Sequence, residues 1–378
     1  MQKKKIMKRR NIILLILFLC LGFTSSLRAA DSAEKSGVDV KEIVIGHMSD
    51  AYDWHITTIA GHHISIPLPV IVKGETSGWQ VFSSSHLTHL HEDELYNGFF
   101  VNKEDGKVYE KLSDGTVARP WDLSITKNVA QIWIAVFLLI FIFLKCASWY
   151  KKRDASSEAP RGFVGAFEAI VVMIKDDVVK ECIGEKRYKP YVPYLLTVFF
   201  FILACNLLGV VPIFPGGGNV TGNISVTLVL AVLTLLIVNF SGNKHYWKEV
   251  FWPDVPTWLK LPIPLMPVIE IISIFTKPFA LMIRLFANMM SGHAVLLSLT
   301  CIIFVGFEIN AAIGSGLTIV SVLLMIFMNF LEVLIDFVQA YIFTMLSAVF
   351  IGMAMPEEEH HKEEKENSAL EQTIIETK

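Results

Sequence analysis

The chain has 378 residues, of which 53% are hydrophobic and only 18% charged, and its mean hydropathy is +0.50. Ordinary soluble domains carry about 25% charged residues, so this composition is that of a membrane protein. The net charge of −3 is uninformative by itself, but the absence of a basic run beyond the N-terminus argues against nucleic-acid binding. The five cysteines lack metal-ligand spacing, and no phosphate-binding loop is present, so we expect neither a cofactor nor a nucleotide on this chain.

Residues 1–30 have the pattern of an export signal. Six lysines and arginines lie between positions 3 and 10, an apolar stretch follows over 11–23, and small residues come at Ala29 and Ala30. This order is typical of a signal peptide. We expect its removal, with an uncleaved membrane anchor as the alternative.

Residues 31–127 are polar and rich in histidine and turns, and apolar runs at 63–72 and 79–82 indicate strands. After an export signal, this segment is predicted to be a small extracytoplasmic strand-and-loop module. Within it, His89 and His91 would share one face of a strand and, with His86, suggest a metal site. A solvated polar loop is the favoured interpretation of these three histidines.

Three apolar spans follow, at 129–147, 191–211 and 224–240. The clusters of basic residues near them all fall on one predicted side, which the positive-inside rule makes cytoplasmic. An amphipathic segment at 162–180 is predicted to lie on that surface. We therefore expect a membrane ion-channel domain over 128–356, followed by an acidic cytoplasmic tail over 357–378.

The last apolar segment, 317–351, contains no proline or glycine. As one helix it would be ~52 Å long at 1.5 Å per residue. The hydrocarbon core is only ~30 Å thick, so we predict a strongly tilted helix. Its partner is 262–305, interrupted at three prolines (Pro264, Pro267 and Pro278) and joined to it through a glycine-containing loop at 306–316. The predicted fold is an all-α polytopic membrane protein with about five membrane helices, the last two forming a long tilted hairpin, plus one interfacial amphipathic helix.

Arg284 lies inside the apolar stretch 279–290. A charge at the centre of a bilayer costs between ~3 and ~10 kcal/mol. The chain can tolerate this cost if the cation faces a protein partner or an aqueous cavity, which predicts ion or substrate handling. The alternative, an arginine that reaches the headgroups from a helix end, is disfavoured because apolar residues continue for more than a turn on both sides.

Other polar residues of the hairpin follow helical spacing. At 100° per residue, the side chains of Glu332, Asp336 and Gln339 form one stripe. His293 points away from the face of Arg284, and so toward that stripe. Such a set of ionisable groups is more typical of a charge-relay path than of helix packing. The candidate ion path comprises Glu270, Arg284, Asn288, His293, Glu332, Asp336 and Gln339.

Several short motifs in 163–356 carry a family resemblance. They are Thr276-Lys277-Pro278, Arg284-Leu285-Phe286-Ala287-Asn288, Leu331-Glu332 and Gln339-Ala340-Tyr341-Ile342-Phe343. With them, the chain resembles subunit a of the rotary F-type ATP synthase. The resemblance implies a stator subunit of a bacterial inner membrane that passes protons through two half-channels to and from a ring of c subunits. It also implies b-type peripheral stalk subunits and the remaining synthase subunits as partners, with no catalysis by this chain itself.

The resemblance implies roles for single residues. Arg284 would be the essential cation that blocks direct leakage, and Asn288 and Gln339 its polar neighbours. Glu270 would line the cytoplasmic exit, whereas His293 and Glu332 would form the inlet.

The chain departs from the family pattern at three positions. Gly209 and Ser225 stand where many members place an acid and an amide, and Asp336 is an additional acid. The sequence leaves open whether the coupling ion is a proton or sodium. A secondary ion-coupled transporter is the alternative function, but the internal repeats of that class are not evident. We expect the N-terminal module to pack against neighbouring subunits outside the cytoplasm, with the C-terminus inside.

Overall fold

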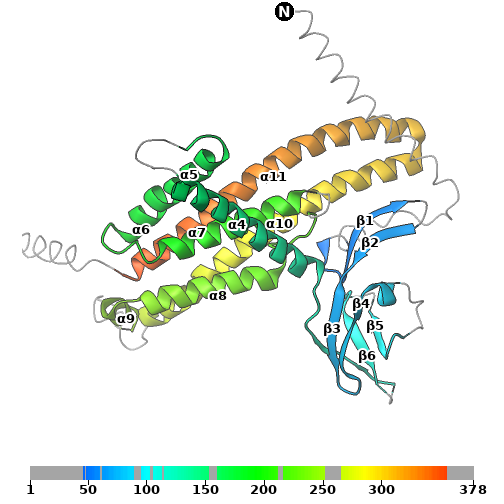
Figure 1. Cartoon of the computed structure of the whole chain (residues 1–378), viewed down its shortest axis with the longest axis horizontal. Coiled ribbons are helices and arrows are strands. Elements are labelled where there is room, and N and C mark those ends of the chain that lie inside the picture. Colours follow the sequence, from blue (N-terminus) through cyan, green and yellow to red (C-terminus); the bar gives the residue numbers. More distant parts are fainter. Residues whose placement is uncertain are drawn as a thin grey trace, which may run out of the picture.

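The computed structural model describes residues 46, 48–59, 62–88, 95–102, 105–112, 115–152, 160–211, 216–251 and 265–355. The predicted signal peptide and acidic tail, and also His89 and His91, lie outside the described residues. The described chain consists of a small part made of strands and a larger part made of long helices (Figure 1).

The described residues of the N-terminal module form three small antiparallel sheets. Their strand orders are β1-β2, β4-β3-β8 and β5-β6-β7. The strands are β1 (Asp53–Ile59), β2 (His62–Pro67), β3 (Pro69–Gly74), β4 (Gly78–Ser83), β5 (Phe99–Val101), β6 (Val108–Lys111), β7 (Val117–Ala118) and β8 (Trp121–Asp122), with the short helix α3 (Ser85–Thr88) after β4. The core between the sheets is apolar and includes Val70, Val72, Phe82, Phe99 and Val108.

The strand character predicted for this module is confirmed, but its boundaries differ from the sequence pattern. The run predicted at 63–72 is divided at Leu68 into two strands that belong to different sheets. Leu68 stands between Pro67 and Pro69, and a proline cannot donate a hydrogen bond to a neighbouring strand. The two prolines explain why the run ends one sheet and begins another.

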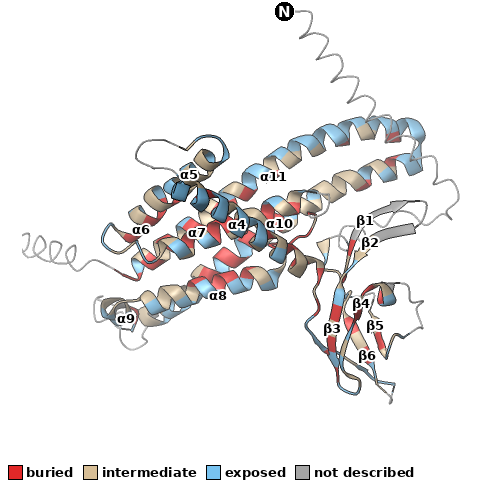
Figure 2. Ribbon diagram, in the orientation of Figure 1, coloured by how far each residue is buried: buried red, intermediate tan, exposed pale blue. Residues whose placement is uncertain are grey.

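In the described part of the chain, five helices are long and apolar enough to cross a membrane, which confirms a polytopic membrane protein. They are α4 (Lys127–Lys152), α7 (Val192–Val210), α8 (Ile224–Ser241), α10 (Leu265–Ile309) and α11 (Ala311–Met353). A short helix, α9 (Lys244–Phe251), follows α8. Much of the surface of α4, α10 and α11 is exposed in the single chain, as expected for helices that face lipid or partner subunits (Figure 2).

The amphipathic segment predicted at 162–180 is helical but not uniform. It forms α5 (Phe163–Met173), a π-helix η2 (Ile174–Lys180) and the short α6 (Glu181–Ile183). The wider turn of the π-helix changes the register of the apolar face. Ile174 and Val178, both within η2, are buried in the main core, whereas Phe163, the first residue of α5 and expected on the same stripe, is 56% exposed.

The prediction of one continuous helix over 317–351 is confirmed, but the predicted breaks around it are wrong. α10 continues through Pro278, and only Asn310 separates it from α11. Gly306 and Gly314, which were expected in a loop, lie within α10 and α11 and let these two helices approach each other closely. A Cβ added to Gly314 would lie 2.6 Å from the Phe307 ring. Membrane helices tolerate proline, and they favour small residues where two helices pack, so neither signal marks a loop here.

Candidate functional site

The hairpin of α10 and α11 holds an imidazole–carboxylate contact. His293 Nδ1 lies 2.8 Å from Glu332 Oε1, and these side chains are 13% and 6% exposed. Gly292 makes room for this contact, since a Cβ at that position would be 2.8 Å from the same Oε1 atom. The side chains of His293 and Glu332 therefore meet between α10 and α11. This agrees with the prediction that His293 points away from the face of Arg284 and toward the stripe that contains Glu332.

A second polar contact lies a little more than one turn before the first on α10. Asn288 Nδ2 donates a hydrogen bond of 2.6 Å to Gln339 Oε1. Gln339 is only 3% exposed, and its Nε2 has no partner among the described residues. The two contacts together fix how α10 and α11 are rotated relative to each other.

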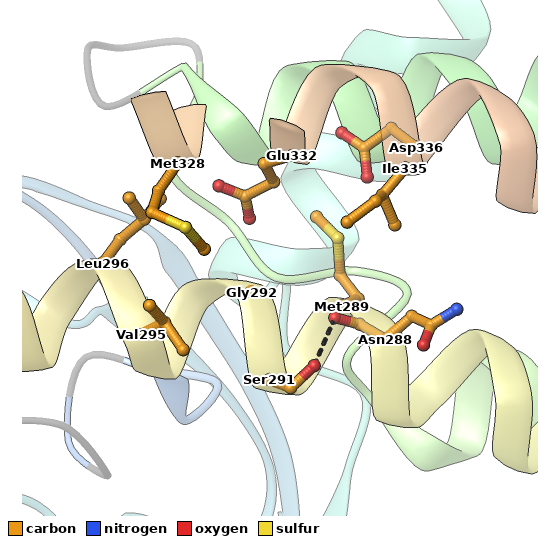
Figure 3. Close-up of a pocket in the computed structure, with 10 residues that line it drawn as sticks. All are labelled: Asn288, Met289, Ser291, Gly292, Val295, Leu296, Met328, Glu332, Ile335 and Asp336. Atoms are coloured by element: carbon orange, nitrogen blue, oxygen red, sulfur yellow. Dashed lines mark hydrogen bonds between the residues drawn. The ribbon is translucent and has the colours of Figure 1, made fainter. Parts of the chain in front are cut away.

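A cavity of about 140 Å³ lies between these helices (Figure 3). Its wall includes Asn288, Glu332 and Asp336. Asp336 is 2% exposed, and neither its Oδ2 nor the Oε2 of Glu332 has a partner among the residues that the structure describes. A buried water needs space and polar partners, and this cavity offers both. The structure thus places the additional acid beside the imidazole–carboxylate contact rather than at an isolated position.

Arg284 lies on a different face of α10 from His293. Its side chain is exposed in the single chain, and no hydrogen bond or ion pair joins it to the described residues. Nine residues at 100° each give a rotation of about 180° from Arg284 to His293. The cation is therefore open to a partner that packs against the outer face of α10.

Glu270 is distant from the polar contacts of the hairpin. It is half-buried near the start of α10, fourteen residues before Arg284, which is ~21 Å along a helix. The neighbouring element is α9, where burial and the negative charge of Glu270 raise the pKa of Tyr246. The structure thus brings together His293, Glu332 and Asp336, and leaves Glu270 at the α9 end.

Gly209 lies on α7 close to the imidazole of His293. A Cβ there would be 2.6 Å from Met289 Cε and 3.5 Å from His293 Nε2. Gly209, where the family resemblance predicts an acid, thus faces the contact between His293 and Glu332. The side chain of Met289 fills the space that a larger residue at 209 would occupy. The roles of Met289 and Gly292 could not be predicted from the sequence, because the burial of a methionine and the close approach of a side chain to a glycine depend on the neighbouring helix.

Two buried amides near the same end of α7 were also not predicted from the sequence. Asn206 Oδ1 accepts a hydrogen bond of 2.6 Å from Thr221, and Gln131 on α4 is fully buried with its Nε2 3.4 Å from Cys205 O. An amide inside an apolar span was the available signal for Gln131.

The histidine cluster of the module gains no support as a metal site. His86 is exposed, and its ring stacks on Tyr96 with centroids 4.6 Å apart. Within the described parts of the chain, no group of three potential ligands is arranged to hold a metal. His89 and His91 lie outside those parts, so the favoured interpretation as a polar loop stays a prediction.

Comparison with known proteins gives two family matches. The family described as "ATP synthase A chain" matches residues 129–352, and a "Domain of unknown function (DUF8433)" matches residues 43–123. The first match contains the entire α10–α11 hairpin up to residue 352.

Individual relatives agree with the first match. "ATP synthase subunit a 2" of Chlorobaculum tepidum is 46% identical over 246 residues, which are 64% of this chain and 66% of the relative. "ATP synthase subunit a" of Chlorobium phaeobacteroides is 43% identical over 267 residues, 68% of this chain and 74% of the relative. "ATP synthase subunit a" of Myxococcus xanthus is 39% identical over 267 residues, with 68% and 80% covered. The chain thus spans just under two thirds of the first relative and more of the other two.

Proposed function

Because the chain belongs to the family of F-type ATP synthase subunit a, a multi-pass membrane subunit of the synthase complex, we propose that it acts as the stator. In this role it passes protons to and from a rotating c-ring through two half-channels and hydrolyses nothing itself. Its other partners are b-type peripheral stalk subunits and the remaining synthase subunits. It resides in a bacterial inner membrane, with the N-terminal module outside and the C-terminus in the cytoplasm. The family match disfavours a secondary transporter.

Arg284 is the cation that the passing ring meets. A guanidinium stays charged at any working pH, whereas a lysine in the same place could lose its proton. A fixed positive charge favours ionisation of a ring carboxylate that comes close to it. It also repels a free proton, so the ion crosses by travelling with the ring. The exposed position of Arg284 on α10 supports this role because it leaves the side chain open to the ring.

The inlet half-channel leads through the contact between His293 and Glu332. An imidazole and a carboxylate 2.8 Å apart can exchange a proton directly. The adjoining cavity extends this path to Asp336, one turn further along α11. This contact, beside a cavity with two carboxylates and facing away from Arg284, is the observation that carries the proposal.

The exit half-channel passes Glu270, near α9. A carboxylate there can receive a proton that leaves the ring on the cytoplasmic side. Its separation of ~21 Å from Arg284 supports two paths that are offset along the hairpin. One elementary charge that crosses 100 mV supplies ~2.3 kcal/mol, which is the energy available to turn the ring.

Replacement of Arg284 by alanine tests the proposal. Vesicles that contain the assembled Arg284→Ala complex should show no ATP-driven acidification, because the ring carboxylate loses the charge that ionises it. Lys145→Ala is the matched control, since Lys145 is an exposed cation on α4, outside the hairpin, and this variant should pump normally. Wild-type acidification by the Arg284→Ala complex would refute the role. Repeating the assay with and without sodium decides the coupling ion.

A further inference from the structure

The β4-β3-β8 sheet of the N-terminal module has an outer face that no described part of the chain covers. The strand register places its side chains in two rows across the three strands. The rows are Trp79, Lys73 and Trp121, and beside them Val81, Ile71 and Leu123. We call these six residues the outer face. Four of its large apolar side chains are exposed, with exposed fractions of 57% for Trp79, 70% for Val81, 78% for Trp121 and 63% for Leu123.

The outer face is not explained by the folding of the module. The opposite side of the same sheet supplies the core, where Val70 and Val72 are fully buried. A half-buried antiparallel sheet normally alternates apolar residues inside with polar residues outside. This sheet carries large apolar side chains on both sides. A contiguous exposed apolar patch of this kind marks an interaction surface.

The composition of the outer face is that of a membrane–water interface. Tryptophan is enriched there because its ring is apolar and its N–H seeks a polar partner. Lys73 lies between the two tryptophans, with its Nζ 5.8 Å from the centre of the Trp79 ring. A lysine can place its methylene stem along an apolar surface and its charge among headgroups.

The module is fixed to the membrane helices at three points. Trp54 Nε1 donates to Gly216 O at 3.2 Å, in the segment before α8. At the start of α4, the amide of Lys127 donates to Ala51 O at 2.9 Å, and that of Asn128 to Asp50 Oδ1 at 3.1 Å. These bonds hold the module, through residues in and just before β1, at the end of the helix bundle where α4 and α8 begin. In Figure 1, β3 lies nearer to α8 than β5 and β6 do.

The outer face continues into the lipid-facing surface of α4. Leu123 precedes Lys127, the first residue of α4, by four residues, which can span at most ~14 Å. On α4 itself, Trp133 and Phe137 are 55% and 62% exposed, and their rings stack with centroids 5.8 Å apart. Trp133 is only ~9 Å along the helix from Lys127. Exposed aromatic side chains therefore extend from the sheet into the first turns of a membrane span.

We propose that the outer face is a membrane seat, which rests on the lipid headgroups of the leaflet where α4 begins. The rings of Trp79 and Trp121 and the side chains of Val81 and Leu123 enter the boundary between headgroups and acyl chains. Lys73 contacts phosphate groups. The seat holds the module flat beside the bundle, and this role is independent of proton transfer.

Site-specific photocrosslinking in the complete synthase, in its native membrane, tests the seat. A benzophenone amino acid replaces Trp79 or Trp121 in separate variants. Val117 is the matched control position, because it is 54% exposed and lies on β7 of the β5-β6-β7 sheet. After irradiation, mass spectrometry identifies the adducts. We expect lipid adducts at positions 79 and 121 and none at position 117.

Three other results would overturn the seat. Adducts of positions 79 and 121 with another synthase subunit would show that the outer face is a subunit interface. Equal lipid adducts at all three positions, or none at any, would show that the face has no particular relation to the bilayer. Each variant is first purified as a complex with its full subunit composition, so that a failure to fold is recognised before irradiation.

Discussion

The contact between His293 and Glu332 depends on a glycine as much as on the two polar side chains. The neighbouring Gly292 presents no Cβ toward α11, and this lets the carboxylate approach the imidazole to 2.8 Å. Helix stability alone would favour alanine over glycine in the middle of a helix. Gly292 therefore contributes to the polar site at the expense of intrinsic helix stability.

Gly292→Ala should slow ATP-driven proton pumping while the complex still assembles. The new Cβ would lie 2.8 Å from Glu332 Oε1, so the carboxylate must move away from His293. Gly316→Ala is the matched control, because nothing lies within 4 Å of a Cβ on this other hairpin glycine. That variant should pump normally and gain up to ~1 kcal/mol in helix stability. Equal pumping rates for the two variants would contradict the role of Gly292.

Glu110 is a buried carboxylate in the N-terminal module. Burial opposes its ionisation, but this effect is outweighed by hydrogen bonds from the hydroxyls of Ser77 and Thr76 and from the amides of Glu75 and Ser77, which lower the pKa of Glu110 to about 2. A carboxyl group whose pKa is lower in the folded state stabilises the fold above its unfolded pKa, here 4.5. That stabilisation is lost as the pH falls from about 4.5 toward 2.

Glu110→Gln should destabilise the β3–β4 turn at neutral pH by about 1–3 kcal/mol, since a neutral amide cannot accept all of these hydrogen bonds. Hydrogen exchange of the amides at 75–77 in the full-length protein measures this loss. The difference between variant and wild type should shrink as the pH is lowered toward 2, after correction for intrinsic exchange rates. A difference that stays constant from pH 7 to pH 3 would show that the charge of Glu110 is not the cause.

At the scale of elements, the hairpin shows what a sequence can and cannot predict. The absence of proline and glycine over 317–351 predicted a continuous helix, and the periodicity of polar residues predicted that His293 faces α11. Both follow from local rules of helix geometry. The continuation of α10 through Pro278 and the helical state of Gly306 and Gly314 depend instead on packing between helices, which no local pattern contains.

The close packing near the turn permits a disulfide test. A Cβ on Gly306 would lie 3.6 Å from the Cβ of Leu317, within the range of 3.5–4.5 Å found in disulfides. Gly306→Cys with Leu317→Cys should therefore form an intramolecular disulfide on mild oxidation, detected by mass spectrometry of the linked peptides. Gly306→Cys with Leu323→Cys is the control, because Leu323 is 71% exposed on α11. A failure of the first pair to react would indicate an open loop at 306–316.

At the scale of the whole molecule, the strand module and the helix bundle are joined near their surfaces rather than through a shared core. Their cores are separate clusters, one around Val70 and Val72 and the other around Phe199 and Phe343. The hydrogen bond from Trp54 to Gly216 connects the two parts. The sequence predicted two regions of different character, but not this contact, because it depends on the tertiary arrangement.

Deletion of residues 31–122 behind the retained signal should leave proton pumping intact in each assembled complex, because no candidate of the ion path lies in the module. Loss of the contact to Gly216 should lower the yield of assembled complex. The measurement is ATP-driven acidification normalised to the amount of complex. Complete loss of pumping in normally assembled complexes would instead show that the module belongs to the ion path.

The single residue between α10 and α11 has a consequence for biogenesis. If α10 entered the bilayer alone, His293 and Asn288 would meet lipid without the partners that α11 supplies, and α11 alone would expose Glu332 and Gln339 in the same way. Polar groups in hydrocarbon cost several kcal/mol each when unsatisfied. Because only Asn310 separates α10 from α11, there is no hydrophilic loop that could remain on the far side of the membrane while the two helices insert one after the other. Residues 265–353 are therefore expected to leave the insertion machinery as one preformed unit, in which His293 already contacts Glu332 and Asn288 already bonds Gln339 when the hairpin first encounters lipid.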